Sequence, residues 1–191
     1  VADFATAVNE LKPQAIIGVA AVGRTFTQPI VQAMSSFNTR PIVFALSNPT
    51  SKSECTAEEA YAWSEGRAVF ACGSPFAPVN IGGKTLVPRQ CNNSYIFPGV
   101  GLGGVATKAR RVTNDMFLAA ADTLANMVSE ADLAQGSLYP PLKDMRSVSA
   151  TIATAVAEVV FKRGLAGVAK PADTAKFIRE NMYEPKYRMY A

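Results

Sequence analysis

Short apolar runs constrain the fold of this chain more than any other feature of its sequence. Residues 14–20 (QAIIGVA) and 41–47 (PIVFALS) are almost continuously apolar, and residues 68–72 form a third, shorter run. Continuous apolar runs of this length are typical of strands that are buried on both faces of a parallel sheet. We therefore expect three buried parallel strands in the first half of the chain.

Helices are expected between these strands. Residues 27–37 place apolar side chains at helical spacing, with Pro29 in the first turn, where its missing N–H costs nothing. After the second run, Thr56 and Glu59 form a capping box, and Gly66 ends the helix that follows it. Alternating strands and helices predict an α/β fold with a doubly wound, mostly parallel Rossmann-like sheet, where ligands bind at the carboxyl ends of the strands.

Strand signals stop beyond about Pro98, and alanine-rich helical segments follow. The expected helices are 115–129, 147–163 and 172–183, with N-caps at Asn114, Ser147 and Asp173 and helix stops at Gly136 and Gly164. The pattern predicts a helical C-terminal portion, residues 99–191, packed on the sheet formed by residues 1–98.

The start of the chain predicts a fragment. Residues 2–11 read as the second half of a helix that runs directly into the first strand, and no initiator Met precedes them. We expect the chain to open in the middle of an α/β unit.

Charge, cysteine content and hydropathy exclude several classes of protein. The net charge is +4, but the 19 basic residues are scattered among 15 acidic ones, so no nucleic-acid partner is expected. The three cysteines have no C-x-x-C spacing and the chain contains no histidine, which predicts ordinary thiols in a reducing compartment. No run approaches the roughly 18 apolar residues of a membrane span. We expect an intracellular protein that is not inserted in a membrane.

Three segments offer groups for ligand binding. Asn48 in LSNPT follows the second strand, and its amide is both donor and acceptor without adding charge, although Asn-Pro is also a common turn. Asn92 and Asn93 lie together in a loop before an apolar run, where a simple polar turn is the alternative. The small residues of segment 18–24 let a flat ring or phosphate approach the backbone, or form a tight strand-to-helix turn.

Two apparent phosphate motifs are rejected. Gly99, Gly101 and Gly104 satisfy G-x-G-x-x-G, but no convincing strand precedes them and no suitable acidic residue follows about 20 residues later, so close helix packing is expected instead. Residues 83–85 imitate the end of a P-loop, yet Pro78 occupies the position of its first glycine. The sequence also contains no Ser-His pair and no convincing acidic metal cluster. It therefore offers binding groups without a catalyst.

Five segments, taken in order, resemble the malic enzyme family, and the likeness covers nearly the whole chain. They are GVAAVGR at 18–24, RPIVFALSNPTSKSECTAEEAY at 40–61, EGRAVFACGSPF at 65–76, CNNSYIFPGVGLGG at 91–104 and LAQGSLYPPL at 133–142. The resemblance implies oxidative decarboxylation of malate to pyruvate and carbon dioxide with NAD or NADP and a divalent metal, Mg or Mn. It also implies that residues 1–98 are the second half of a nucleotide-binding domain.

Residue by residue, the resemblance assigns binding groups only. Asn48 matches an asparagine that contacts malate and the nicotinamide side of the cofactor, and Asn92 and Asn93 match paired asparagines, one of which binds substrate. The backbone of Val19, Ala20 and Ala21 matches a loop that flanks the nicotinamide ring. Two positions depart from the family, because Cys91 and Ala21 each replace a glycine.

The remaining implications concern the intact protein. The general base, the general acid, the metal ligands and the dinucleotide fingerprint of the family all precede this chain, so the resemblance implies an inactive fragment that needs its missing N-terminal part. It also implies a homo-oligomer, a dimer or tetramer, in the cytoplasm or the mitochondrion. A stand-alone α/β binding or assembly module without catalysis is the alternative.

Overall fold

The structure is a computed structural model that describes residues 3–187 of the chain. The chain divides into two compact units. The first contains the residues up to Asn92 together with Val128–Tyr139, and the second contains Asn93–Met127 and the residues from Pro140 onward. The boundary expected between residues 98 and 99 concerns the domains of the intact protein and stays a prediction.

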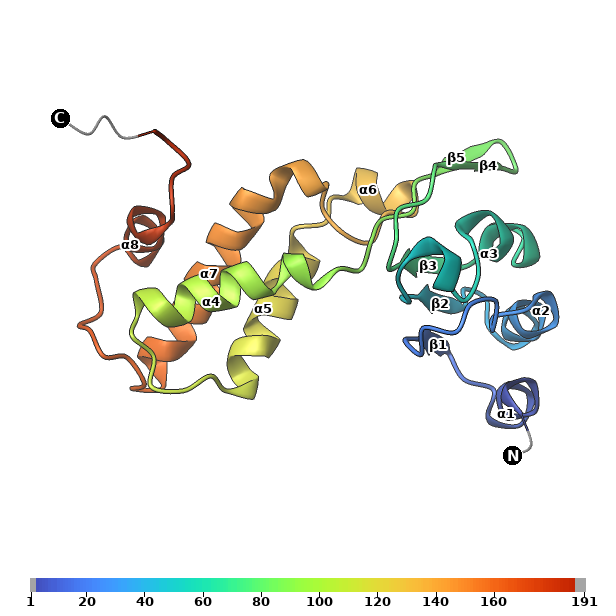
Figure 1. Ribbon diagram of the computed structural model, residues 1–191, viewed down its shortest axis with the longest axis horizontal. Helices are drawn as coiled ribbons and strands as arrows, with labels where there is room; N and C mark the ends of the chain where they lie inside the picture. The colour runs from blue at the N-terminus through green and yellow to red at the C-terminus, as the bar shows by residue number, and fades with distance from the viewer. Residues whose placement is uncertain (1–2, 188–191) are drawn as a thin grey trace. The chain divides into compact units, whose positions relative to one another are not determined.

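The first unit is built on a three-stranded parallel sheet. Its strands are β1 (Ala15–Gly18), β2 (Ile42–Ala45) and β3 (Val69–Cys72), in the order β1-β2-β3 (Figure 1). All three lie inside the apolar runs that predicted them, so the expected parallel α/β fold is confirmed. The strands are shorter than the runs because Ser47 and other residues beyond their carboxyl ends turn away to form loops.

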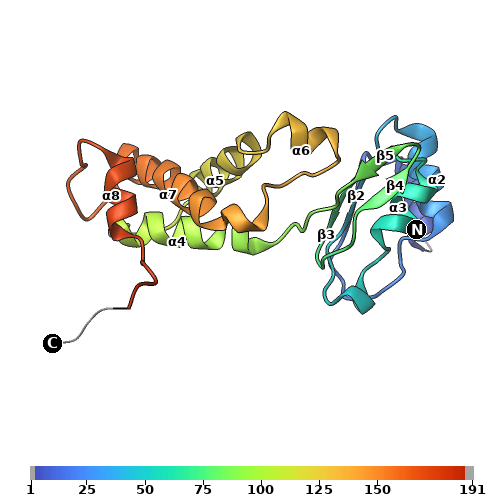
Figure 2. The same cartoon turned by 90° about the horizontal axis from the view of Figure 1, so that it is seen from above.

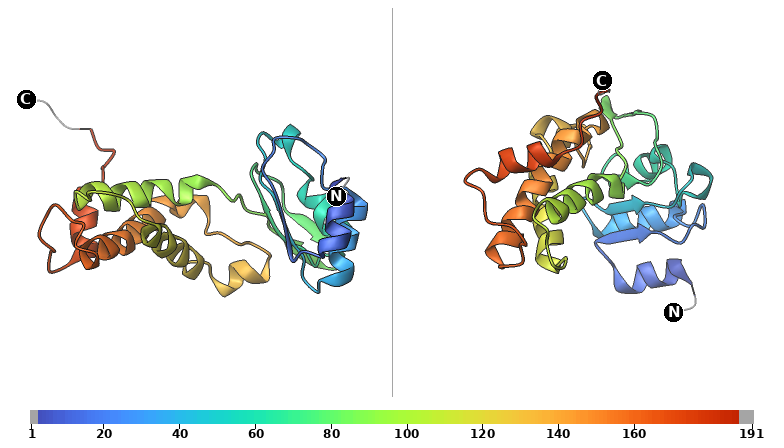
Figure 3. Two further views of the ribbon diagram at one scale, coloured as in Figure 1. Left: turned by 90° about the horizontal axis from the view of Figure 1, so that it is seen from below. Right: turned by 60° about the vertical axis from the view of Figure 1, so that its left-hand side comes forward.

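Three helices cover one face of this sheet. They are α1 (Phe4–Leu11), α2 (Gln28–Phe37) and α3 (Ala57–Trp63), and they lie on the same side of the strands in Figures 2 and 3. The expected capping box is present at the start of α3, where Thr56 and Glu59 exchange hydrogen bonds. Gly66 follows this helix with a positive φ of 75°, and its N–H donates to the carbonyl of Tyr61.

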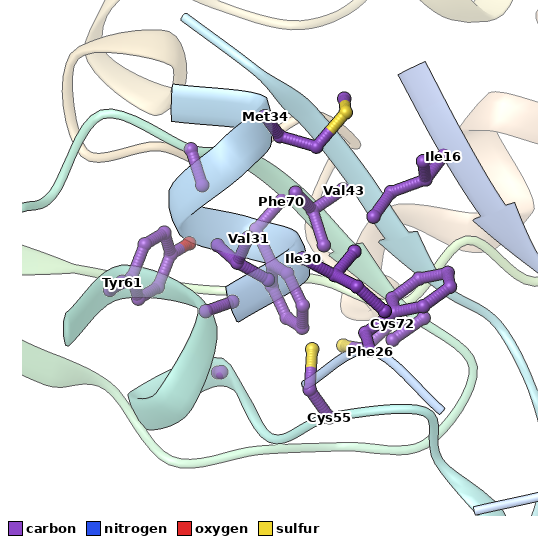
Figure 4. Packing of buried hydrophobic residues seen from close by; sticks show 14 of the residues in the cluster. Ile16, Phe26, Ile30, Val31, Met34, Val43, Cys55, Tyr61, Phe70 and Cys72 are labelled. Atoms are coloured by element: carbon purple, nitrogen blue, oxygen red, sulfur yellow. The ribbon is translucent and has the colours of Figure 1, made fainter. Parts of the chain in front are cut away.

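The core of the first unit lies between these helices and the covered sheet face. Ile16, Val43 and Phe70 form a row across the three strands because they are partners in the parallel register. Val31 of α2 and Tyr61 of α3 pack against this row, and the ring of Tyr61 meets Phe70 edge-on with centroids 5.6 Å apart (Figure 4). Burial of such side chains stabilises the fold by roughly 1.5–3 kcal/mol each.

The opposite face of the sheet is less covered than the sequence predicts. Ile17 in β1 is 60% exposed, and Phe44 and Val69 on the same face are half-buried, whereas Ala71 is buried. The expectation that these strands are buried on both faces is therefore wrong for the described residues. This face of the sheet is most exposed at Ile17 and least exposed at Ala71.

A small hairpin was not expected from the sequence. Strands β4 (Val79–Ile81) and β5 (Lys84–Leu86) pair antiparallel, and the two residues between them, Gly82 and Gly83, both have positive φ. Glycine pairs of this kind form the tight two-residue turns that match strand twist. The segment that imitates a P-loop is thus a hairpin, which agrees with rejecting that motif.

The short helix α6 (Glu130–Ala134) also belongs to the first unit.

The second unit is helical, as predicted. It contains α4 (Phe97–Ala106), α5 (Asn114–Asn126), α7 (Met145–Lys162) and α8 (Thr174–Asn181). The long helix α7 packs against the other three. Among the described residues, no helix is both long and apolar enough to cross a membrane.

The predicted helix ends are confirmed in part. Asp173 caps α8 by accepting from the N–H of Lys176. Gly164 follows α7 and Gly136 follows α6, both with positive φ. The other two expected caps are wrong, because the N-caps of α5 and α7 are Thr113 and Asp144, one and three residues earlier than expected.

The four glycines of α4 differ in how closely α7 packs against them. A Cβ at Gly99 would lie 2.6 Å from Ile152 of α7, and one at Gly103 would lie 2.8 Å from the carbonyl oxygen of Ala153. Close packing is therefore confirmed for Gly99 and extends to Gly103. It is wrong for Gly101 and Gly104, where an added Cβ would meet no atom within 4 Å.

Candidate functional site

The carboxyl ends of β1, β2 and β3 bring three loops together. The loop after β1 contains Val19 and Ala21, the loop after β2 contains Asn48, and the loop after β3 contains Ser74. Because the strands are parallel and adjacent, these loops emerge at one edge of the sheet, which is where open α/β sheets bind ligands.

Asn48 lies exposed at this edge, and a residue from the next loop holds its amide. The hydroxyl of Ser74 donates to Oδ1 of Asn48 at 2.8 Å, while Nδ2 makes only a long contact of 3.4 Å with the carbonyl of Leu46. The orientation leaves Nδ2 able to donate to a ligand. The loops after β2 and β3 can lie this close together only with glycine at position 73, because a Cβ there would lie 2.1 Å from the carbonyl oxygen of Leu46.

The loop after β1 presents both backbone and apolar side chains to solvent. Val19 is 73% exposed and Val22 is 55% exposed, and Ala20 and Ala21 between them are also exposed. Ala21 has a φ of +54°, in the left-handed region that disfavours every residue except glycine. This backbone conformation would suit the glycine that the resemblance implies at this position.

Ser47 and Glu54 connect the first two loops. The N–H of Ala21 donates to the hydroxyl of Ser47 at 2.9 Å, and that hydroxyl donates in turn to Glu54. The N–H of Ser47 also donates to Glu54, at 3.3 Å. The loop that contains Ala21 is therefore hydrogen-bonded to the loop that contains Asn48, because Ser47 is the immediate neighbour of Asn48.

The paired asparagines fall at the boundary between the two units. The N–H of Cys91 donates to the carbonyl of Cys72 at 2.8 Å, and the amide of Gln90 donates to the carbonyl of Gly73 at 3.0 Å. These bonds fix the segment before Asn92 beside the end of β3. Asn92 is half-buried and belongs to the first unit.

Asn93 is described with the second unit. It is exposed and begins a short 3-10 helix, Asn93–Tyr95. The hydroxyl of Tyr95, the last residue of this turn, donates to the carbonyl of Pro140 at 2.5 Å. This bond anchors the turn that carries Asn93.

An ion pair between Arg89 and Asp132, called the clamp below, stabilises the segment that leads to Asn92. Arg89 donates to Asp132 at 2.6 Å and also to the carbonyl of Tyr139, and both partners of the ion pair are largely buried. Hydrogen bonds from the hydroxyl of Ser129 and from Arg89 lower the pKa of Asp132. Cys91 precedes the asparagine pair, and its sulfur accepts a hydrogen bond from the hydroxyl of Tyr139 at 2.9 Å.

Cys55 and Cys72 are not poised as nucleophiles. Burial raises the pKa of Cys72 to about 12 and that of Cys55 to about 12, and the carboxyl groups of Glu59 and Glu54 add to the effect at Cys55. Both thiols therefore stay protonated at neutral pH. This agrees with the expectation of ordinary buried thiols, because the thiolate is the reactive form.

The residues at the sheet edge fit a flat organic ligand with hydrogen-bond acceptors better than a metal. Nδ2 of Asn48 offers a hydrogen-bond donor suited to a carboxamide or carboxylate, and exposed Val19 and Val22 offer apolar surface to a ring. Within residues 3–187, no three His, Cys, Asp or Glu side chains gather closely enough to hold a metal ion. The described residues therefore do not fit the divalent metal that the resemblance implies.

A parallel sheet with helices between its strands and binding groups at their carboxyl ends is an architecture that dinucleotide-binding domains share with other open α/β folds. Residues 1–161 match the family described as the NAD binding domain of malic enzyme. The chain therefore belongs to the malic enzyme family.

The sequence is similar to plant enzymes over almost its full length. It is 55% identical over 185 residues to the chloroplastic NADP-dependent malic enzyme of Zea mays, covering 96% of this chain and 29% of that relative. It is 51% identical over 191 residues to NADP-dependent malic enzyme 1 of Arabidopsis thaliana, covering 100% of this chain and 33% of that relative. The chain thus spans about a third of the length of these relatives.

The fold is also similar to a solved malic enzyme. The crystal structure of malic enzyme from Pyrococcus horikoshii Ot3 matches with a TM-score of 0.67 and 27% sequence identity, over 88% of this chain and 34% of that one. The α/β fold expected from the sequence is therefore confirmed by comparison as well as by the strand order.

Sequence reasoning missed three polar residues that shape this edge: Ser47, Glu54 and Ser74. Ser47 and Ser74 lie within one or two residues of predicted strand ends, which is a usable signal. Glu54 gives no such signal, because it stands among polar residues and only the folded structure buries it.

Proposed function

We propose that this chain is part of an NADP-dependent malic enzyme and contributes contacts to malate and to the nicotinamide end of the cofactor. The observation that carries the proposal is the exposed Asn48 amide, oriented by Ser74 beside the exposed Val19 loop at the carboxyl edge of a parallel sheet. In this role Asn48 aligns substrate and cofactor, and the intact enzyme converts malate to pyruvate and carbon dioxide.

The proposed roles follow from the chemistry of each group. Nδ2 of Asn48 donates a hydrogen bond without adding charge, so it orients a malate carboxylate without competing with a metal for it. The backbone of Val19, Ala20 and Ala21 lines the ring, while Asn92 and Asn93 supply further amides for substrate. When bound, the cofactor accepts the hydride that malate loses on oxidation.

NADP is the proposed cofactor rather than NAD. Support comes from the relatives in maize and Arabidopsis, both named NADP-dependent. The Mg or Mn of the family and the groups that transfer protons are proposed to come from the part of the enzyme outside this chain. No acidic cluster within the described residues stands in for them.

The isolated chain is proposed to be inactive. It spans about a third of its plant relatives, and its sheet presents an apolar side chain, Ile17, that is 60% exposed. A strand as apolar as β1 is usually covered on both faces, which supports a missing part of the same protein against this sheet. A homo-oligomer in an intracellular compartment is part of the same proposal, and one relative is named chloroplastic.

Two assays test the proposal. The full-length enzyme should oxidise malate with NADP and Mn²⁺, whereas the 191-residue chain should show no turnover under the same conditions. In the full-length enzyme, Asn48→Ala should raise the malate KM or lower kcat by roughly 10–100-fold, the effect expected when a positioning hydrogen bond to a charged substrate is lost. Unchanged kinetics would remove Asn48 from the site, and ordinary turnover by the isolated chain would refute its inactivity.

A further inference from the structure

Glu54 is a buried carboxyl group at the edge of the sheet where the proposed binding loops meet. The residue is 2% exposed, and within the described part of the chain no Lys or Arg lies at ion-pair distance from it. A buried carboxyl group without hydrogen bonds destabilises a fold by several kcal/mol. Its surroundings therefore have to supply donors.

Ser47 supplies both donors. Its backbone N–H donates to Oε2 of Glu54 at 3.3 Å, and its hydroxyl donates to Oε1. The hydroxyl oxygen also accepts the N–H of Ala21 at 2.9 Å. Since a hydroxyl has a single proton, the bonds run in one direction, from Ala21 through Ser47 to Glu54.

The hydrogen bonds that run from Ala21 through Ser47 to Glu54 are called the relay below. The backbone around the relay leaves space for the Glu54 side chain. A Cβ at Gly18, the last residue of β1, would lie 2.3 Å from Cδ of Glu54, so only glycine leaves room for the carboxyl group. The N–H of Phe26 donates to the carbonyl of Glu54 at 3.1 Å, and the N–H of Arg24 donates to the carbonyl of Ser53 at 3.0 Å. Side chain and backbone of Glu54 thus both hold the loop that follows β1.

We propose that Glu54 is a positioning residue for the cofactor: acting through Ser47, it fixes the Ala21 loop and the adjacent Asn48 in the arrangement that receives the nicotinamide end. This inference rests on the proposed function. The carboxyl group touches neither substrate nor cofactor, but it has two acceptor atoms where two donors of Ser47 converge. An amide of the same shape offers only one acceptor and adds a donor.

The test uses the full-length enzyme and the fluorescence of NADPH on binding. Glu54→Gln should weaken NADPH binding by about tenfold, as expected for loss of one hydrogen bond that holds the loop in place. Ser47→Ala should weaken it to a similar extent, and the double variant should be no worse than either single one, because both remove the same relay. Ser47→Thr keeps the hydroxyl and should restore binding close to that of the wild type.

Glu58→Gln is the matched control, because Glu58 is exposed on α3, four residues further along the chain. Its NADPH affinity should equal that of the wild type. If Glu54 only stabilises the fold, Glu54→Gln and Ser47→Ala will lower Tm while NADPH affinity measured well below Tm stays unchanged, and the inference is overturned.

Two further outcomes are separable. If Glu54→Gln does not fold, Ser47→Ala decides alone, because it keeps the carboxyl group and its bond from the Ser47 N–H and removes the hydroxyl that links Glu54 to Ala21. If the wild-type enzyme itself neither binds NADPH nor oxidises malate, the proposed function fails. If the wild type does both, and the Glu54 and Ser47 variants bind NADPH as tightly as the wild type, the inference alone fails.

Discussion

The hydroxyl of Ser74 donates a 2.8 Å hydrogen bond to Oδ1 of Asn48, although the two residues follow different strands and lie 26 positions apart. The bond determines which end of the amide faces solvent. With Oδ1 occupied, Nδ2 is the group presented at the edge of the sheet. The orientation of the proposed substrate contact is thus set by a neighbouring loop.

Removing this hydroxyl should loosen substrate binding without abolishing it. In the full-length enzyme, Ser74→Ala should raise the malate KM by about 3–10-fold, because the Asn48 amide loses one net hydrogen bond and gains rotational freedom. Asn48→Ala combined with Ser74→Ala should be no worse than Asn48→Ala alone, since Ser74 acts through Asn48. Steady-state kinetics measure both effects. Ser36→Ala, an exposed position on α2, should leave KM unchanged, and additive losses in the double variant would contradict the coupling.

The left-handed backbone at Ala21 predicts a stabilising substitution. Ala21→Gly should raise the free energy of unfolding of the 191-residue chain by about 0.5–1 kcal/mol, because a Cβ is disfavoured at a φ of +54°. Ala20, the preceding residue, is not among those with positive φ. Ala20→Gly should therefore lower stability by about 0.5 kcal/mol through the entropy of the unfolded chain. Urea unfolding monitored by circular dichroism measures both changes, and equal effects at the two positions would refute this explanation.

The strands and helices could be predicted because local sequence patterns specify them. The apolar run at 41–47 contains β2, and Thr56 with Glu59 marks the start of α3. The hairpin of β4 and β5 escaped prediction because strands of three residues are too short to show a period. The exposed face at Ile17 was not predicted either. An apolar run indicates that a strand is suited to burial on both faces, but it does not indicate which residues cover each face.

The candidate site was predictable only to the level of its exposed groups. Asn48 stands directly after a predicted strand, so its place at the sheet edge follows from strand order. Glu54 lies seven positions from Ser47, and its burial depends on the space that Gly18 leaves in another strand. Contacts of this kind arise from tertiary packing and have no local signal.

Two adjacent glycines in α4 should respond in opposite ways to the same substitution. Gly103→Ala should destabilise the chain by about 1–3 kcal/mol, because the new Cβ would lie 2.8 Å from the carbonyl oxygen of Ala153 and 2.9 Å from Val156. Gly104→Ala should stabilise it by about 0.5–1 kcal/mol, since no atom lies within 4 Å and alanine favours a helix. Thermal unfolding of the two variants compares them directly. A loss of stability in Gly104→Ala similar to that in Gly103→Ala would mean that packing does not distinguish the two positions.

The ion pair between Arg89 and Asp132 predicts a pH-dependent contribution to stability. Hydrogen bonds from Ser129 and Arg89 lower the pKa of Asp132 in the folded chain, below the roughly 3.9 of an unfolded aspartate. A lowered folded-state pKa contributes stability that is present above the unfolded value and is lost as pH falls through the folded value. Asp132→Asn should therefore reduce the free energy of unfolding by about 1–2 kcal/mol at pH 7.

The difference between Asp132→Asn and the wild type should shrink as pH falls below about 4, because protons then bind the unfolded wild type more readily than the folded one, until both chains carry a neutral group at this position. Urea unfolding of the 191-residue chain at pH 7, 5 and 3 measures it. Glu180→Gln is the control, because Glu180 is exposed and 3.9 Å from Lys176, and its effect should stay within about 0.5 kcal/mol. A difference for Asp132→Asn that is constant from pH 7 to pH 3 would show that this carboxylate does not stabilise the clamp through its charge.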